Sequence, residues 1–124
     1  MEVSKGQSPD KQMKMDSTEH TVLNEALERM WIQFLPQIEE RVTTLESAIA
    51  AISTGPLSTE QHEAAHAAAH KLAGVLGTFG LTRGTELARE LEIFYSSEHG
   101  AETAMRERLI SIAAELRAVV ESRK

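Results

Sequence analysis

The sequence contains no cysteine and no long apolar run. Without cysteine it forms no disulfide, no cysteine-based zinc site and no thiol nucleophile, and its composition fits a reducing compartment. No segment approaches the roughly 20 apolar residues that span a bilayer, and the N-terminus lacks the apolar stretch of a secretory signal. We therefore expect a cytoplasmic protein that is not embedded in a membrane.

The chain also lacks an excess of positive charge. Its formal net charge is −6, which disfavours binding to nucleic acid or to anionic lipid, because both require a basic face. A length of 124 residues, with 41% hydrophobic and 26% charged residues, is ordinary for one globular domain. The composition therefore favours a single domain whose partner is a protein or a small molecule.

The N-terminal residues differ from the rest of the chain. Residues 1–17 are polar and show no sustained apolar period, so we interpret them as a flexible leader before a helical domain over 18–124. From Leu23 to Ile52, apolar residues then recur every three to four positions, which is typical of an amphipathic helix. Pro36 interrupts this pattern and predicts a kink or break near Leu35, giving an additional short N-terminal helix before a longer one.

Three further helical segments follow. The second begins at Ser58 or Thr59, where a hydroxyl can cap the free amides, and stops at Gly80. The third is expected over about 82–96 and the fourth over about 101–122, each with an apolar stripe. Amphipathic helices joined by short connections predict an all-α, antiparallel four-helix bundle.

One face of the second helix is unusual. At 100° per residue, the face opposite Leu72 collects His62, Glu63, His66, Ala67, His70, Ala73, Gly74 and Gly77. A glycine inside a helix costs about 1 kcal/mol relative to alanine, so two of them on an exposed stripe require a reason. Small residues one turn from His70 leave its imidazole accessible and allow another protein to approach the helix backbone.

An accessible imidazole suits phosphoryl transfer. It is largely neutral near pH 7, is a good nitrogen nucleophile, and forms a phosphoramidate that passes the phosphoryl group onward. Catalysis of such transfer rests on positioning and charge neutralisation, commonly with Mg²⁺. The sequence shows no obvious carboxylate cluster for Mg²⁺, so we expect no intrinsic cofactor and a metal that arrives with the partner. Lys71 can lend positive charge at the edge of this site.

The segment AHKLAGVLGTFGL at 69–81, followed by LARELE at 87–92, resembles the histidine-containing phosphotransfer (HPt) domain of multistep phosphorelays. The resemblance covers His70, Leu72, Gly74, Gly80 and the following helix. It implies that His70 accepts a phosphoryl group from the phospho-aspartate of a receiver domain, and that a second receiver accepts it. Receivers of response regulators or hybrid sensor kinases are thus the implied partners, and the protein is a relay intermediate without independent turnover.

The exposed face of the second helix and the resemblance together point to the neighbouring positions. Lys71, Gly74, Gly77 and Glu92 support the phosphoacceptor, and the docking face includes His66, Ala67 and Ala73. Glu92 falls where the family often places a polar residue that hydrogen-bonds the other imidazole nitrogen and aims the reactive one. Ala73 departs from the family, which usually carries lysine three residues after the histidine.

Two other functions stay open on the sequence. A non-catalytic helical adaptor would bind a receiver or kinase through the same face, and the alanine at position 73 supports it. A histidine-rich metal binder would use His62, His66 and His70, which follow one another at helical turns, with Glu63 as a possible fourth ligand. We expect no physiological metal site, because three or four converging ligands are not evident.

The remaining expectations concern the oligomeric state, two surface arginines and the leader. No long apolar stripe demands a dimer, so we expect a monomer. Arg83 and Arg89 are interpreted as solvated charges without a role. The polar leader suits a free-standing protein or an excised module of a larger one equally well.

Overall fold

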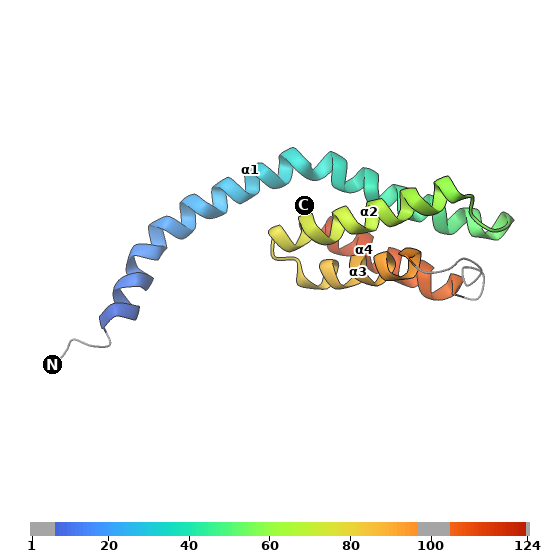
Figure 1. Cartoon of the computed structure of the whole chain (residues 1–124). Coiled ribbons are helices and arrows are strands. Elements are labelled where there is room, and N and C mark those ends of the chain that lie inside the picture. The colour runs from blue at the N-terminus through green and yellow to red at the C-terminus, as the bar shows by residue number, and fades with distance from the viewer. Residues whose placement is uncertain (1–6, 97–104, 124) are drawn as a thin grey trace. The chain divides into compact units, whose positions relative to one another are not determined.

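The computed structural model describes residues 7–96 and 105–123, with side chains from residue 19 onward. The elements are α1 (Gln7–Ala51), a 3₁₀ turn η1 (Ile52–Thr54), α2 (Thr59–Thr78), α3 (Thr82–Ser96) and α4 (Arg106–Arg123). The described residues contain no strand. The predicted all-α class is therefore confirmed (Figure 1).

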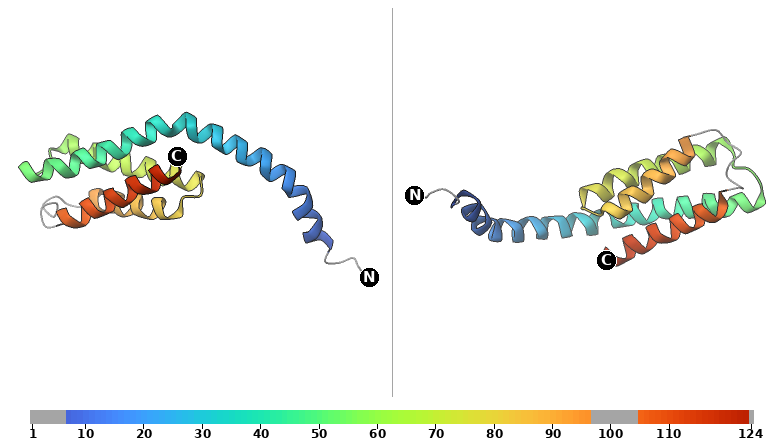
Figure 2. Two further views of the ribbon diagram at one scale, coloured as in Figure 1. Left: turned by 180° about the vertical axis from the view of Figure 1, so that it is seen from behind. Right: turned by 90° about the horizontal axis from the view of Figure 1, so that it is seen from below.

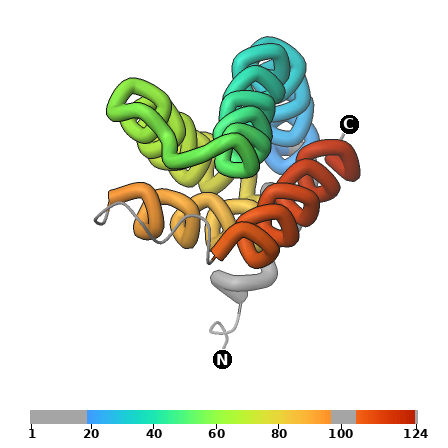
Figure 3. Tube along the Cα trace, turned by 90° about the vertical axis from the view of Figure 1, so that its right-hand side faces the viewer, coloured from blue at the N-terminus to red at the C-terminus, as the bar shows by residue number. Residues whose placement is uncertain are grey.

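The chain divides into two compact units, over 1–34 and 35–124. The first unit holds the N-terminal part of α1, and its Val22, Leu23 and Ile32 are exposed. The second unit holds the rest of α1 together with α2, α3 and α4, which surround a common core when viewed along the helices (Figure 3). The second unit is the predicted four-helix bundle.

Each helix of the bundle contributes one apolar stripe to the core. Helices α2 and α3 pack side by side, and α3 packs on α4 (Figure 2). Burying one large aliphatic side chain contributes about 1.5–3 kcal/mol to the stability of the fold, relative to leaving that side chain exposed. The largest buried aliphatic side chains in this unit are Ile38, Val42, Leu45, Leu72, Leu76, Leu87, Leu91, Leu109, Leu116 and Val120.

The N-terminus of α2 is fixed by a capping box. The Ser58 hydroxyl accepts a hydrogen bond from the Gln61 amide at 3.1 Å, and the Gln61 side chain accepts one from the Ser58 amide at 2.8 Å. Both bonds satisfy amides that an open helix end leaves without partners. The predicted start at Ser58 or Thr59 is thus confirmed.

The α2–α3 connection is equally well defined. Gly80 has a φ of 73°, and its amide donates to the Gly77 carbonyl at 3.0 Å. The Leu81 amide donates to the Leu76 carbonyl at 3.0 Å. This pair of bonds is a Schellman motif, which needs a left-handed residue that glycine adopts without a steric cost. The motif ends α2 and lets α3 begin at Thr82, as predicted.

Helix α1 differs from its prediction. It begins at Gln7, so residues 7–17 are helical where the sequence suggested a leader without regular structure; residues 1–6 lie outside the described residues. Of the kink or break predicted near Leu35, the break into a separate short helix is wrong, because α1 continues through Pro36. Pro36 is exposed, and on an exposed face the carbonyl that loses its donor is open to water. The division into 1–17 and 18–124 stays a prediction.

The fourth helix was expected over about 101–122. Its described part is Arg106–Arg123, and residues 101–104 lie outside the described residues. None of the helices in the described part of the chain is long and apolar enough to cross a membrane.

Candidate functional site

His70 lies on α2 with its side chain exposed to 69%. Its Nδ1 is 2.7 Å from Oε2 of Glu92 on α3, a carboxylate that is exposed to 27%. The contact joins residues 22 positions apart, so it depends on the tight turn that pairs α2 with α3. The sequence-based expectation that Glu92 lies beside the imidazole thus agrees with the geometry.

This contact distinguishes the two nitrogens of the ring. A carboxylate only accepts hydrogen bonds, so in neutral His70 the proton is on Nδ1, which donates it to Glu92. Nε2 then carries the lone pair. Among the described residues no hydrogen bond to Nε2 is present, and the ring is exposed. The arrangement presents Nε2 as a nucleophile to an approaching molecule.

Glycines form the surface of α2 one and two turns beyond His70. Gly74 is exposed, and a Cβ added there would meet no atom within 4 Å. Gly77, the next turn along, is also exposed, and a Cβ there would lie 3.5 Å from Thr85 Oγ1. Neither glycine is therefore required by packing against α3. We refer to His70, Gly74 and Gly77 as the open face.

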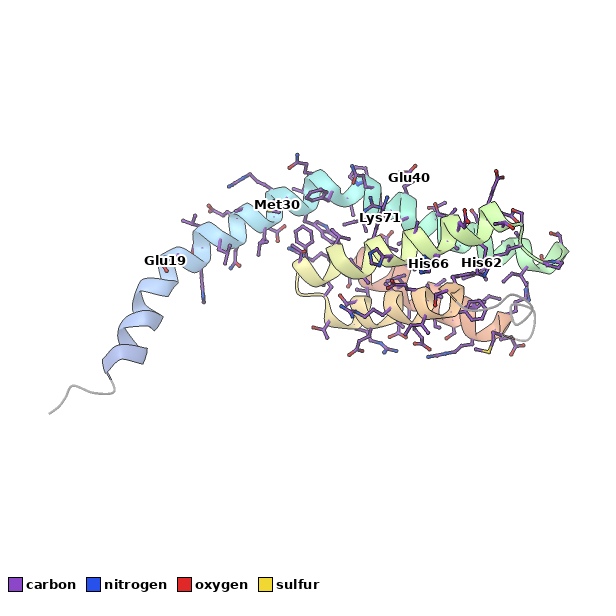
Figure 4. The ribbon with its side chains drawn as sticks, in the orientation of Figure 1. Glu19, Met30, Glu40, His62, His66 and Lys71 are labelled. Atoms are coloured by element: carbon purple, nitrogen blue, oxygen red, sulfur yellow. The ribbon has the colours of Figure 1, made fainter. Side chains whose placement is uncertain are left out.

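The predicted docking residues do not all lie on this surface. Ala67 is exposed and His66 is half-buried. Ala73 is only 5% exposed, so its placement on the docking face is wrong. Helix α3 lies beside it: the Thr85 hydroxyl donates to the Ala73 carbonyl at 3.4 Å. The predicted Lys71 side chain is exposed on α2 (Figure 4).

The histidines do not form a metal centre. His62 was expected on the exposed face but is only 7% exposed, and its ring packs edge-on against Tyr95 of α3 at 5.4 Å. His70 faces Glu92 instead of the other histidines. Within the described residues, no group of three or more histidine, aspartate or glutamate side chains could hold a metal ion. Figure 4 shows His62 and His66 along α2.

Sequence reasoning missed Thr85 of α3 and interpreted Arg89 as a solvated charge without a role. Thr85 contacts the α2 backbone at Ala73, and Arg89 follows it by one helical turn. Their spacing with Glu92, at i, i+4 and i+7, was a signal that could have found them, because residues so spaced share one helix face.

The other polar contacts of the bundle are ion pairs between helices. Arg83 of α3 donates to both carboxylate oxygens of Glu115 on α4, at 2.7 and 3.0 Å. The hydrogen bond from Arg83 lowers the pKa of Glu115 below its ordinary value. Arg108 of α4 pairs with Glu90 of α3, and Arg117 of α4 pairs with Glu46 of α1.

Comparison with known proteins agrees with this geometry. Protein RcaC of Microchaete diplosiphon is 38% identical over 66 residues, which cover 53% of this chain and 10% of that protein. The matched stretch is therefore a small part of the relative's length. No solved structure matches the chain. The family model described as Hpt domain matches residues 29–122, which is most of the chain and includes His70 and Glu92. The chain therefore belongs to the Hpt domain family.

Proposed function

We propose that this protein is a phosphorelay intermediate that carries a phosphoryl group on Nε2 of His70. The observation that carries the proposal is the contact between His70 Nδ1 and Glu92 at 2.7 Å on an otherwise exposed ring. Family membership supports the same role, because Hpt domains are phosphotransfer modules and not classical enzymes.

The donor in this proposal is the phospho-aspartate of a receiver domain. The Nε2 lone pair attacks phosphorus, the P–O bond to the aspartate breaks, and the aspartate leaves as a carboxylate. No proton has to move, since the Nδ1 proton stays between His70 and Glu92. The ring becomes positively charged when Nε2 is phosphorylated, and the Glu92 carboxylate stabilises that charge. A second receiver reverses the step.

The partner completes the site. Mg²⁺ is proposed to come with the receiver, where it neutralises charge on the transferring group. The surface from Ala67 past Gly74 to Gly77 gives the receiver a close approach to the α2 backbone. We propose that the protein works as a monomer in the cytoplasm with receivers of response regulators or hybrid kinases, and that it has no turnover of its own.

The test is transfer from a phosphorylated receiver. A panel of ³²P-labelled receiver domains is incubated with the protein and Mg²⁺, and the label is tested for acid lability and alkali stability. We expect such label on the wild type and on His20→Gln, a matched control at an exposed histidine of α1. His70→Gln should take none.

Two results would contradict the proposal. Label that persists in His70→Gln would place the acceptor elsewhere. A wild type that binds receivers in calorimetry but takes label from none of them would favour the adaptor function, which the buried alanine at position 73 supports.

A further inference from the structure

Building on the proposed function, we propose that Arg89 of α3 supplies the cation that neutralises the phosphoryl group on His70. The family usually provides a lysine three residues after the histidine, and here that position is Ala73, which is buried. The positive charge is thus delivered from the neighbouring helix instead of from α2.

The contacts of α3 place Arg89 beside the site. Thr85 bonds the α2 backbone at Ala73, and Glu92 bonds His70. Arg89 lies four residues after Thr85 and three before Glu92, so it shares the face of α3 that these two contacts turn toward α2. Residues at these spacings have Cβ atoms about 5–6 Å apart. The long arginine stem therefore starts about one turn from the carboxylate that holds the imidazole.

The space that the guanidinium needs is open. Helices α2 and α3 run antiparallel. Arg89, which lies between Thr85 and Glu92, is therefore opposite the α2 segment between Gly77 and His70. That segment presents Gly74, where an added Cβ would meet nothing within 4 Å. Arg89 is itself exposed, so its head group can move over Gly74 to the Nε2 side of the ring.

Arg89 also has its charge available. Three other arginines of the bundle, Arg83, Arg108 and Arg117, are held by carboxylates on neighbouring helices. Arg89 forms no ion pair or hydrogen bond of its side chain within the part of the chain that the structure describes. A guanidinium that is not already paired can bind an incoming anion without first breaking a contact.

The chemistry of the site requires such a cation. A phosphoryl group carries about −1.5 to −2 charges near pH 7, and at this site it arrives next to the Glu92 carboxylate. The carboxylate stabilises the phosphorylated ring but repels the phosphoryl oxygens. A guanidinium binds two such oxygens through parallel N–H donors and offsets that repulsion. Lys71, which precedes Leu72 on α2, is the competing cation and serves as the comparison.

The experiment uses phosphoramidate as a small-molecule donor, which removes effects on receiver docking. The Nε2 lone pair attacks phosphorus, the P–N bond of phosphoramidate breaks, and ammonia leaves with its own protons. The rate of His70 phosphorylation is followed by ³¹P NMR for the wild type, Arg89→Ala, Arg89→Lys, Lys71→Ala and Arg106→Ala. Arg106 is the matched control, an exposed arginine that lines a groove between α1 and α4.

We expect Arg89→Ala to slow phosphorylation about fivefold, the upper range for one exposed charge pair. Arg89→Lys keeps the charge without the two parallel donors, so its rate should fall between those of the wild type and Arg89→Ala. Arg106→Ala should match the wild type. Added salt should slow the wild type and have little effect on Arg89→Ala, because screening weakens an electrostatic contribution that the variant lacks. A purely structural role of Arg89 would not give this salt dependence.

The outcomes separate the two proposals. If the wild type is phosphorylated and Arg89→Ala reacts at the same rate, the assignment of Arg89 is wrong and the proposed function stands. If Lys71→Ala is the slow variant, the cation is on α2 and the assignment is again wrong. If the wild type takes label neither from phosphoramidate nor from a phosphorylated receiver, the proposed function fails and Arg89 has no role in it.

Discussion

The side of α3 that faces α4 and the side that faces α2 differ in how their charged residues are paired. Toward α4, Arg83 is bound to Glu115 and Glu90 is bound to Arg108, so cations and anions there hold helices together. Toward α2, Glu92 is bound to the His70 imidazole, and Arg89 is left without a partner among the described residues. The charged residues on the α4 side of α3 thus form ion pairs that connect helices. On the α2 side, an arginine unpaired among the described residues can still bind a ligand.

Two glycines, one on each of α2 and α3, differ in what surrounds them. Gly84 of α3 is buried, and an added Cβ would lie 3.0 Å from Leu76 Cδ1 and 3.2 Å from Val119 Cγ1. Gly74 of α2 is exposed and faces open space. The first glycine is required by packing, and the second is not.

The largest effect on stability is expected at Gly84, where an added side chain would meet close neighbours. Gly84→Ala should lower the free energy of unfolding by up to about 2 kcal/mol, because the cost of about 1–3 kcal/mol for shifting Leu76 and Val119 exceeds the roughly 1 kcal/mol that alanine gains as the better helix former. Urea unfolding followed by circular dichroism measures this change. A variant as stable as the wild type would show that the α2–α3–α4 contact has room to spare.

A smaller effect is expected at the imidazole contact. Glu92→Ala should slow phosphorylation of His70 about tenfold, a cost of about 1.4 kcal/mol, because the ring loses the partner that orients it and fixes its tautomer. Glu90→Ala, which removes a carboxylate of the same helix that binds Arg108 instead, is the matched control. Equal rates for the two variants would mean that the contact with His70 does not serve transfer.

Substitution on the open face should separate stability from transfer. Gly74→Ala should raise the free energy of unfolding by about 1 kcal/mol, since alanine is the better helix former and meets no neighbour. It should also slow transfer from a receiver while leaving phosphorylation by phosphoramidate unchanged, because only the larger donor needs the free backbone. Unchanged transfer from a receiver would remove the docking explanation for this glycine.

The smallest effect is expected at an exposed ion pair. Arg83 lowers the pKa of Glu115, so this contact stabilises the fold at neutral pH and loses its effect as the pH falls below 4.5 and through the lowered folded pKa. The melting temperature of Glu115→Gln should therefore lie slightly below that of the wild type at pH 7. The two proteins should converge in acid. A gap that widens as the pH falls would contradict the sign of this linkage.

The sequence predicted best what is decided locally. The limits of α2 and α3 follow from Ser58, Gly80 and the apolar period, and the structure confirms them. Local signals also misled at Pro36, where a helix break was expected and α1 continues. A proline on an exposed face costs less than the rule for helix interiors suggests, since water can serve the freed carbonyl.

The sequence predicted less well which residues of α2 face outward. His62 and Ala73 were placed on the exposed face, but both are buried, and Tyr95 and Thr85 of α3 lie beside them. Helical periodicity gives the relative directions of side chains and not the position of the neighbouring helix. The spacing of Arg89 with Thr85 and Glu92 can be read in the sequence, but whether the charge of Arg89 is available depends on which carboxylates the other arginines bind.

The three-residue turn between α2 and α3 has a consequence for how such a protein can diversify. One residue inserted or removed between Thr78 and Thr82 would disturb the Schellman motif that pairs α2 with α3, and with it the contact between Glu92 and His70. The contact between His70 and Glu92 therefore constrains the length of this turn. Under the proposed function, new receiver preferences would arise by substitution at exposed positions such as Ala67 and Lys71, and not by insertions or deletions in the turn that aligns His70 with Glu92.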